Sequence, residues 1–229
     1  MLNKIFPSCA AALVDVRDGA VVLVGGFGEG GMPMALVEAL IEQGARDLTI
    51  VSNNAGNGET GIAALLKAGR VRKVVCSFPR QADSHWFDSS YRAGKVELEL
   101  VPQGTLAERI RAAGAGIGAF FTPTAAGTDL AKGKETRVLD GRLHVLELPL
   151  AGDLAVIAAD RADRWGNLTY RKTSRNFAPI MASAARCAVV QVREVVPLGA
   201  IDPEAVVTPG IFVHRVVQVN VPTKRVQSA

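Results

Sequence analysis

The chain has 229 residues, of which 48% are hydrophobic and 21% are charged, and its formal net charge at pH 7 is +4. These values are typical of a folded globular chain and exclude the disordered and fibrous classes. The basic residues are scattered and only 5% of the residues are aromatic, so the sequence disfavours a nucleic-acid-binding surface, whereas a small anionic ligand suits the mild positive charge.

The cysteines and the apolar runs indicate the compartment. The three cysteines, Cys9, Cys76 and Cys187, lie far apart and form no CxxC pair, so the sequence predicts a reduced, cytoplasmic chain. Charged residues at positions 15 to 18 interrupt the first apolar stretch, which argues against a signal peptide. No apolar run reaches the roughly 18 residues of a membrane span, so we expect no membrane association.

Over the first hundred residues, short β-branched runs alternate with helical patterns. Strands are predicted at 20–24, 47–52, 71–78 and 96–101, and helices at 33–44, 59–69 and 82–94. Each of these helices closes on a glycine, as expected for a helix C-terminus. This alternation predicts βαβ units and a parallel sheet.

The pattern changes in the second half of the chain. A capping box with Thr105 as N-cap and Glu108 predicts a helix that runs to Gly114. Residues 135–150 read as two strands joined at Asp140-Gly141. A strand at 153–159, a polar segment at 160–179, a short helix at 179–187 and strands near 187–196 and 211–219 follow. We expect one α/β domain over residues 1–221, with a largely parallel mixed sheet, and a loose tail over 222–229.

The first candidate site is a glycine-rich segment, 24-VGGFGEGGMP-33, between a predicted strand and a predicted helix. Its core, GFGEGG, satisfies the G-x-G-x-x-G pattern of dinucleotide-binding loops. Such loops also need an acidic residue about 20 positions later, and this chain has 52-SNN-54 there, which argues against an NAD(P) enzyme. Two interpretations remain: close approach to a phosphate or acyl group, or a tight turn before a helix that Pro33 starts.

Two further polar clusters follow predicted strands, where the ligand crevice of an open parallel sheet lies. Asn53 and Asn54 open the first cluster, and either position a substrate or form an Asn/Gly turn. Gln103 opens the second, and either donates its amide N–H to a developing oxyanion or belongs to a helix-entry loop. The three histidines show no metal-ligand spacing, and no G-x-S-x-G elbow occurs. The sequence therefore indicates a binding half-site without a nucleophile.

A basic stretch is the last feature singled out from the residues alone. Between positions 160 and 176 lie Arg161, Arg164, Arg171, Lys172 and Arg175. A solvated loop explains such a stretch, and so does contact with a phosphate or with a partner surface.

Six segments, in this order, resemble the A chain of the family I 3-oxoacid CoA-transferases. They are VGGFGEGGMP, SNNAGNGETG, VPQGTLAERIRAAGAGIGAFFTPTAAGT, GKE, DRWGNLTYRKTSRNFAP and TPGIFV. The resemblance covers almost the whole chain, from Leu2 to Val219. Within the family, segment 56–84 is similar to chains that act on 3-oxoadipate, with acetoacetate or another short-chain 3-oxoacid as the alternative acceptor.

The resemblance implies a fold like that of ribose phosphate isomerase and a ping-pong transfer of CoA from succinyl-CoA. In the family, a glutamate attacks the acyl-CoA, and an acyl-glutamyl anhydride and then a glutamyl-CoA thioester form. This glutamate belongs to the B chain, and the sequence around Glu59 does not match its motif. The resemblance thus predicts an enzyme without a cofactor, inactive without its B chain, and α2β2 as the expected assembly.

The resemblance also assigns site residues. It implies that Gly25, Gly26, Phe27, Gly28, Glu29, Gly30 and Gly31 bind CoA, because outward N–H groups at a helix start suit anionic or carbonyl oxygens. The resemblance also implies that Gln103 donates to the oxyanion. Asn53 and Asn54 are expected to contact the substrate because of their place after the second predicted strand, and not because of the family. No metal ligands are expected.

Arg80 is a further candidate, argued from the substrates and not from the family. 3-Oxoadipate and succinate each carry a second carboxylate that must stay unreacted, and a guanidinium would hold it through two hydrogen bonds. Arg80 follows the third predicted strand, so we expect it near the same crevice.

Overall fold

Seven parallel strands form the central sheet of the computed structural model, which describes residues 2–220. The order is β11-β10-β8-β1-β2-β3-β4, and the short β9 pairs antiparallel with β8. The strands are β1 Val21–Val24, β2 Leu48–Val51, β3 Val71–Cys76, β4 Glu97–Leu100, β8 Gly152–Ala162, β9 Leu168–Thr169, β10 Ala185–Val195 and β11 Arg215–Gln218. The predicted α/β class with a largely parallel sheet is confirmed.

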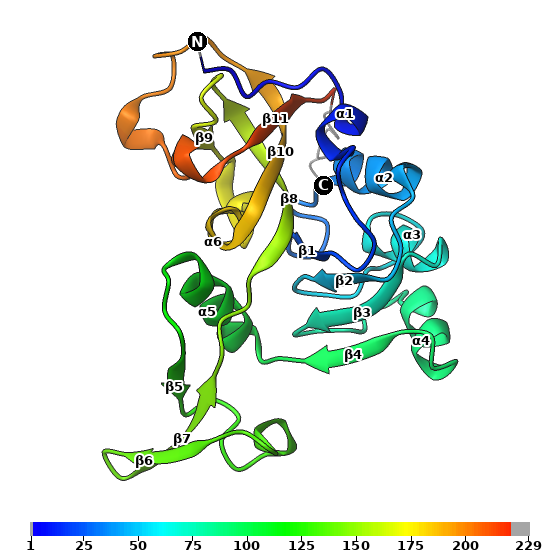
Figure 1. Cartoon of the computed structure of the whole chain (residues 1–229), viewed down its shortest axis with the longest axis vertical. Coiled ribbons are helices and arrows are strands. Elements are labelled where there is room, and N and C mark those ends of the chain that lie inside the picture. Colours follow the sequence, from blue (N-terminus) through cyan, green and yellow to red (C-terminus); the bar gives the residue numbers. More distant parts are fainter. Residues whose placement is uncertain (1, 221–229) are drawn as a thin grey trace, which may run out of the picture.

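Helices cover both faces of this sheet (Figure 1). The α-helices are α1 Cys9–Leu13, α2 Met34–Gln43, α3 Ile62–Lys67, α4 His85–Arg92, α5 Gln103–Gly114 and α6 Ala178–Ala184. The first four pack on one face and α5 and α6 on the other, so the side chains of β1 alternate between two cores: Val22 and Val24 point to the first and Leu23 to the second. Strands buried on both faces explain the nearly continuous apolar runs in the sequence.

The strand order reverses at β1, and this determines where the site lies. The chain runs from β1 through β2 and β3 to β4 on one side, and then returns to β8 on the other side of β1. A crevice opens outside the carboxyl ends of the strands at such a reversal. The glycine loop follows β1 directly and therefore lies at this point.

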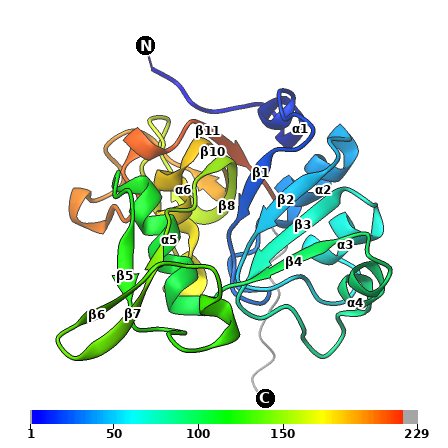
Figure 2. The same cartoon turned by 60° about the horizontal axis from the view of Figure 1, so that its bottom comes forward.

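A small antiparallel sheet projects from the main body, at the bottom of Figure 1 and in green in Figure 2. It contains β5 Phe120–Thr122, β6 Thr136–Leu139 and β7 Arg142–Glu147, in the order β5-β7-β6. The predicted hairpin is confirmed, because Asp140 and Gly141 both have positive φ, as a two-residue hairpin turn requires. The hairpin does not join the central sheet, so the antiparallel component expected there is limited to β9.

Several boundaries differ from the prediction. The strand predicted at 211–219 is the 3₁₀ turn η4 Gly210–Phe212 followed by β11, and α6 ends at Ala184, where β10 begins. The sequence did not predict α1, β5 or β9, nor the 3₁₀ turns η1 Asp129–Ala131, η2 Lys172–Arg175 and η3 Pro203–Ala205. The predicted loose tail, 222–229, lies outside the described residues.

The predicted capping box is wrong. Helix α5 begins at Gln103, two residues before the predicted N-cap, because Pro102 has extended backbone and takes the N-cap position. Thr105 thus lies inside the helix, where its hydroxyl is buried and has no partner in the described part of the chain. The carboxylate of Glu108 pairs instead with Arg111, one turn further along. Gln103 consequently occupies the first helical position, beside the crevice.

Candidate active site

The glycine loop is a tight turn at the carboxyl end of β1. Phe27 and Gly30 exchange backbone hydrogen bonds of 2.9 and 3.1 Å. The backbone angle φ is +121° at Gly26, +59° at Gly28 and +75° at Gly31, a region that favours glycine. Within residues 2–220, no acceptor is found for the backbone N–H of Gly28 or Gly31. The loop is therefore a genuine turn, and it also leaves donors available.

Asn176, on the segment between β9 and α6, holds this loop in place. Its Oδ1 accepts from the N–H of Gly26 at 3.2 Å, and its Nδ2 donates to the carbonyl of Gly30 at 2.8 Å. Gly31 packs so closely on the same segment that a Cβ atom would overlap the carbonyl oxygen of Ser174. The sequence pattern did not indicate Asn176, although this residue lies at the end of the basic stretch.

Side-chain amides and a hydroxyl meet where β2, β3 and β4 end. Gln103 Nε2 donates to Asn53 Oδ1 at 2.7 Å, and Ser77 Oγ donates to the same oxygen at 2.8 Å. Asn53 is 4% exposed, whereas Gln103 is exposed. An amide group has two N–H donors, so Gln103 keeps one for a ligand while Asn53 fixes its position. The structure thus brings Gln103 and Asn53 together and adds Ser77, which no sequence motif singled out.

Asn54 is buried beside a narrow cavity between the two predicted loops. Its Oδ1 accepts from the N–H of Gly56 at 3.0 Å, but its Nδ2 has no partner in the part of the chain that the structure describes. Leaving a buried donor without an acceptor costs about 1–3 kcal/mol, and a ligand oxygen at this position would remove that cost. The cavity, of about 30 Å³, is lined by Gly28, Glu29, Met32, Met34, Asn54, Gly56, Asn57, Thr60, Gly61, Ile62 and Gln81. The prediction that both loops border one crevice is confirmed.

Arg80 lies apart from this cavity. Its Nε donates to Asp88 Oδ1 of α4 at 2.6 Å, and 58% of its side chain is exposed. The next residue, Gln81, lines the cavity instead. The guanidinium of Arg80 therefore already has a carboxylate partner.

Glu59 belongs to a surface cluster that ties the second loop to α3 and α4. Its carboxylate accepts from Lys67 Nζ at 2.7 Å and from Trp86 Nε1 at 3.0 Å, and it lies 3.1 Å from His85 Nε2. The hydrogen bond from Lys67, followed by that from Trp86, lowers the pKa of Glu59. The hydrogen bond to Asp83, at 2.7 Å, is the main cause that raises the pKa of His85.

These shifts predict a pH-dependent stability. A raised histidine pKa contributes stability below its unfolded pKa of about 6.5, and this contribution is lost as the pH rises through the folded pKa. Glu59 stays ionised in this window, since its pKa is lowered. We expect His85→Gln to lower the melting temperature at pH 6, with a difference from the wild type that shrinks towards pH 9. A difference that does not vary with pH would contradict this, and His144→Gln is the control.

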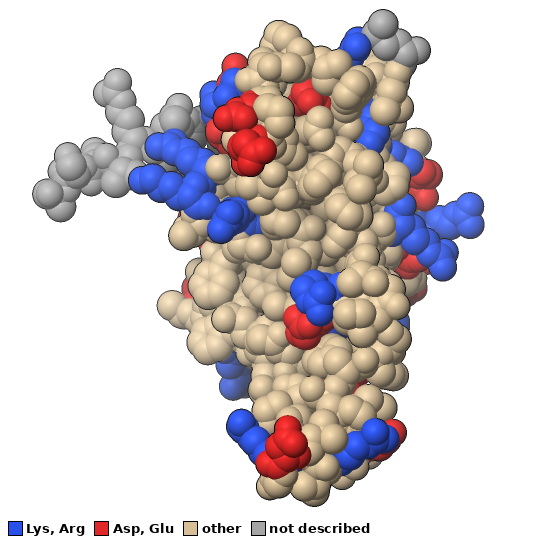
Figure 3. All heavy atoms as spheres, turned by 90° about the vertical axis from the view of Figure 1, so that its left-hand side faces the viewer, with Lys and Arg blue, Asp and Glu red and all other residues tan. Residues whose placement is uncertain are grey.

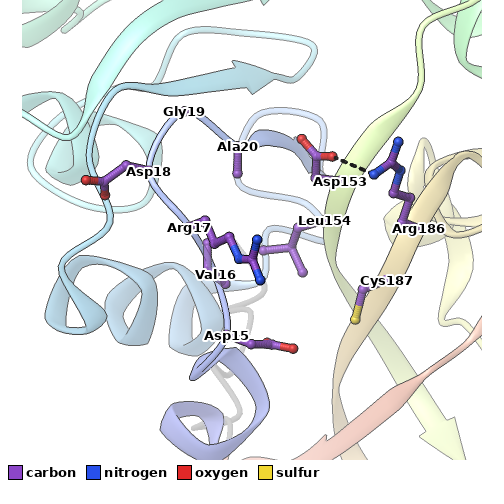
Figure 4. Close-up of a pocket in the computed structure, with 10 residues that line it drawn as sticks. All are labelled: Asp15, Val16, Arg17, Asp18, Gly19, Ala20, Asp153, Leu154, Arg186 and Cys187. Carbon is purple, nitrogen blue, oxygen red and sulfur yellow. Dashed lines mark ion pairs between the residues drawn. The ribbon is translucent and has the colours of Figure 1, made fainter.

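A larger cavity, of about 380 Å³, lies at the opposite ends of the strands, where β1, β8 and β10 begin (Figure 4). Its acidic groups are engaged in the fold. Asp153 accepts from the N–H of Val21 at 2.9 Å and lies 4.0 Å from Arg186, while Asp15 pairs with Arg215. This cavity lies away from the carboxyl ends of the strands and from both loops, so it is not part of the site.

Two other kinds of functional feature are missing from residues 2–220. None of the helices in this part of the chain has both the length and the apolar character needed to cross a membrane. The same residues contain no group of three or more His, Cys, Asp or Glu side chains arranged to hold a metal ion.

Comparison with known proteins gives consistent matches. Residues 6–219 match the family described as Coenzyme A transferase. The chain is 66% identical, over 96% of its length and 95% of the relative, to the A chain of a 3-oxoadipate CoA-transferase from Pseudomonas putida. It is 48% identical, over 98% of its length and 92% of the relative, to the A chain of a succinyl-CoA:3-ketoacid coenzyme A transferase from Xanthomonas campestris pv. campestris.

A solved structure shares the fold. It is an acyl-CoA transferase from E. coli O157:H7 in a thioester complex with CoA, with a TM-score of 0.81 and 22% sequence identity. The match covers 95% of this chain but 47% of that one, so the chain spans about half the length of that transferase.

Proposed function

Since the chain belongs to the coenzyme A transferase family, we propose that it is the A chain of a heteromeric enzyme that moves CoA from succinyl-CoA to 3-oxoadipate. The relative from Pseudomonas putida, at 66% identity, is named for 3-oxoadipate. The proposed partner is a B chain, and the proposed assembly is α2β2 in the cytoplasm. The free state of the three cysteines supports that compartment. The reaction needs no cofactor, because CoA is itself a substrate.

The division of roles between the two chains rests on one observation. The crevice offers hydrogen-bond donors, whereas the ionised carboxylate of Glu59 beside it is already bound by other side chains of this chain. Gln103 and Asn54 each have an amide N–H directed to no acceptor within residues 2–220, and Gly28 and Gly31 contribute backbone N–H groups. Glu59 is bound by Lys67, Trp86 and His85. Donors stabilise a developing oxyanion but cannot attack a carbonyl. The proposal therefore assigns the attacking glutamate to the partner, and Glu29, which also lines the cavity, is the carboxylate of this chain that the experiment below tests directly.

The steps follow from that assignment. The partner's carboxylate adds to the thioester carbonyl of succinyl-CoA, and the C–S bond breaks to give an anhydride and the CoA thiolate. The thiolate then adds to the glutamyl carbonyl and releases succinate, leaving an enzyme thioester. 3-Oxoadipate reverses these steps and leaves as its CoA thioester, which regenerates the carboxylate.

This chain's residues act on the oxygens that become negative in these steps. Gln103, fixed by Asn53, is proposed to donate to the tetrahedral oxyanion, because its side chain is exposed and its amide keeps a second N–H for a ligand. Asn54 is proposed to bind a substrate carboxylate through its unpartnered Nδ2. The glycine loop, Gly25 to Gly31, is proposed to lie along CoA, since it presents bare backbone.

A second acceptor is kept as a candidate. The relative from Xanthomonas campestris, at 48% identity, is named for a 3-ketoacid, so acetoacetate or another short-chain 3-oxoacid is the alternative to 3-oxoadipate. Steady-state kinetics with both acceptors separates the two candidates, because the preferred one has the higher kcat/KM.

Arg80 provides a test of acceptor recognition. If its guanidinium leaves Asp88 to hold the distal carboxylate, Arg80→Ala raises the KM for 3-oxoadipate about tenfold and leaves the KM for acetoacetate nearly unchanged. The measurement is the acceptor KM in the two-chain enzyme. Asp88→Ala is the matched control, since it removes the ion pair and retains the arginine. An equal increase for both acceptors would rule out this role.

The experiment that tests the proposed function mixes this chain with the purified partner chain. Each chain alone should show no transfer between succinyl-CoA and 3-oxoadipate, and the mixture should show it. After incubation with succinyl-CoA, intact-mass spectrometry should find CoA attached to the partner, with loss of one water, and not to this chain. CoA attached to this chain would place the nucleophile here and refute the proposal. The loss of CoA attachment in an enzyme whose A chain carries Glu29→Gln or Glu59→Gln would refute it in the same way. Light scattering of the mixture tests the α2β2 assembly.

A further inference from the structure

A separate cavity, of about 390 Å³, adjoins the other side of the glycine loop. Phe27 and Gly30 of the loop form one wall, and Thr173, Arg175 and Asn176 form the other. The second wall comes from η2, on the segment that connects β9 to α6 in Figure 1. This cavity does not include Gln103 or Asn54, so it is distinct from the crevice in which the acyl transfer is proposed to occur.

The turn that forms this second wall has three uncompensated positive charges. Arg171, Lys172 and Arg175 lie within five residues and are all exposed. Among residues 2–220, no carboxylate lies within ion-pairing distance of any of them, whereas Arg193 and Arg215 each pair with an aspartate. Like charges this close repel one another, so the fold presents here a positive field that an anion would neutralise. On the face of the molecule that Figure 3 shows, most of the middle is uncharged, apart from one basic group beside an acidic one.

The loop and the turn are fixed relative to each other. Asn176 bonds to Gly26 and Gly30, and Gly31 lies against Ser174. A ligand that lies along the glycine loop is thereby directed over the turn. The Phe27 side chain at the loop tip is 53% exposed, and its ring offers an apolar surface for a flat group.

We propose that this cavity binds the phosphorylated nucleotide end of coenzyme A, the carrier of the thioester. Arg175, which lines the cavity, and Arg171 and Lys172, which flank it on the same turn, would contact the phosphates, and Phe27 would lie against the base. Guanidinium groups suit phosphate oxygens because they donate two parallel hydrogen bonds. The inference rests on the proposed function, since it extends the CoA site from the glycine loop to the basic turn. The proposal also gives the basic stretch a role in phosphate contact, whereas a merely solvated loop would have none.

The test uses the enzyme assembled from both chains and two donors, succinyl-CoA and succinyl-pantetheine, which lacks the nucleotide and its phosphates. For Arg171→Ala/Arg175→Ala, we expect the KM for succinyl-CoA to rise about tenfold. The kcat and all constants for succinyl-pantetheine should stay within about twofold of the wild type, because the lost contacts are absent from that substrate. Arg92→Ala, which removes an exposed arginine of α4 that pairs with no carboxylate within residues 2–220, is the matched control and should change neither donor's KM.

Two further arms identify the phosphate source. Adenosine 3′,5′-bisphosphate should compete with succinyl-CoA in the wild type and about tenfold more weakly in the double variant. Inorganic phosphate at the same concentration should not compete, since it lacks the base; equal competition would show a simple anion site and overturn the proposal. The succinyl-CoA KM should also rise with salt, less steeply in the double variant, since exposed charges are screened.

The outcomes separate the two levels of inference. Equal losses on succinyl-CoA and succinyl-pantetheine would overturn the nucleotide site while leaving the transferase intact. An assembled enzyme that transfers CoA from neither donor would instead refute the proposed function. Because activity with succinyl-pantetheine also reports on folding and assembly, a misfolded variant would be recognised by losing both activities.

Discussion

Replacing Gln103 by alanine is expected to lower kcat about 100- to 1000-fold, with little change in the KM for either substrate. The reason is that the donated bond strengthens only when the carbonyl oxygen becomes an oxyanion, so its loss is felt in the transition state. Gln103→Glu is nearly the same size but exchanges the N–H donor for an acceptor, and it should be at least as damaging. The measurement is steady-state transfer from succinyl-CoA in the two-chain enzyme.

The control for this prediction lies in the same turn of α5. Gly104 has ordinary helical backbone, and a Cβ there would meet no atom within 4 Å, so Gly104→Ala should leave kcat unchanged. If Gln103→Ala instead raised KM and preserved kcat, the side chain would bind the ground state, and the oxyanion role would be wrong. Asn53 should behave as a positioning residue, because its Oδ1 holds Gln103 Nε2 at 2.7 Å.

The sequence predicted the scaffold of this site well, because its signals there are local. Glycines with positive φ follow helices α2, α3 and α4 at Gly44, Gly69 and Gly94, where the pattern indicated helix ends. The strands that precede the crevice were predicted within one or two residues, since their apolar runs are continuous. The crevice then followed from the rule for the carboxyl ends of parallel strands.

What the sequence could not predict depends on contacts between distant segments. Asn176 reaches Gly26 across 150 positions, and no local pattern in RKTSRNFAP indicates that contact. The start of α5 was misplaced because Thr105 and Glu108 have the spacing of a capping box, whereas tertiary packing buries Thr105 inside the helix. Arg80 was expected at the crevice from its place after β3, but the side chain pairs with α4 instead. These differences arise from side-chain partners, which chain order does not specify.

Gly31 is constrained both by its local backbone conformation and by its contact with a distant segment of the chain. Its φ of +75° lies in the left-handed region, which costs an alanine about 1–2 kcal/mol. A Cβ there would in addition overlap the Ser174 carbonyl, which is backbone and cannot rotate away. Gly28 shares the first constraint, with φ of +59°, but has no atom within 4 Å of a Cβ position. Comparing the two positions therefore isolates the contact between the loop and the basic turn.

Gly31→Ala is expected to reduce kcat/KM for succinyl-CoA about 100-fold more than Gly28→Ala does. To relieve the overlap, either the loop or the turn must move, which breaks the bonds of Asn176 to Gly26 and Gly30 and separates the two walls that CoA is proposed to contact. Gly28→Ala should retain those bonds, and its only cost should be the left-handed backbone conformation that an alanine must adopt there. The measurements are kcat/KM and the melting temperature of the assembled enzyme. Equal losses in the two variants would mean that backbone strain alone matters and that the close packing on Ser174 has no part in binding CoA.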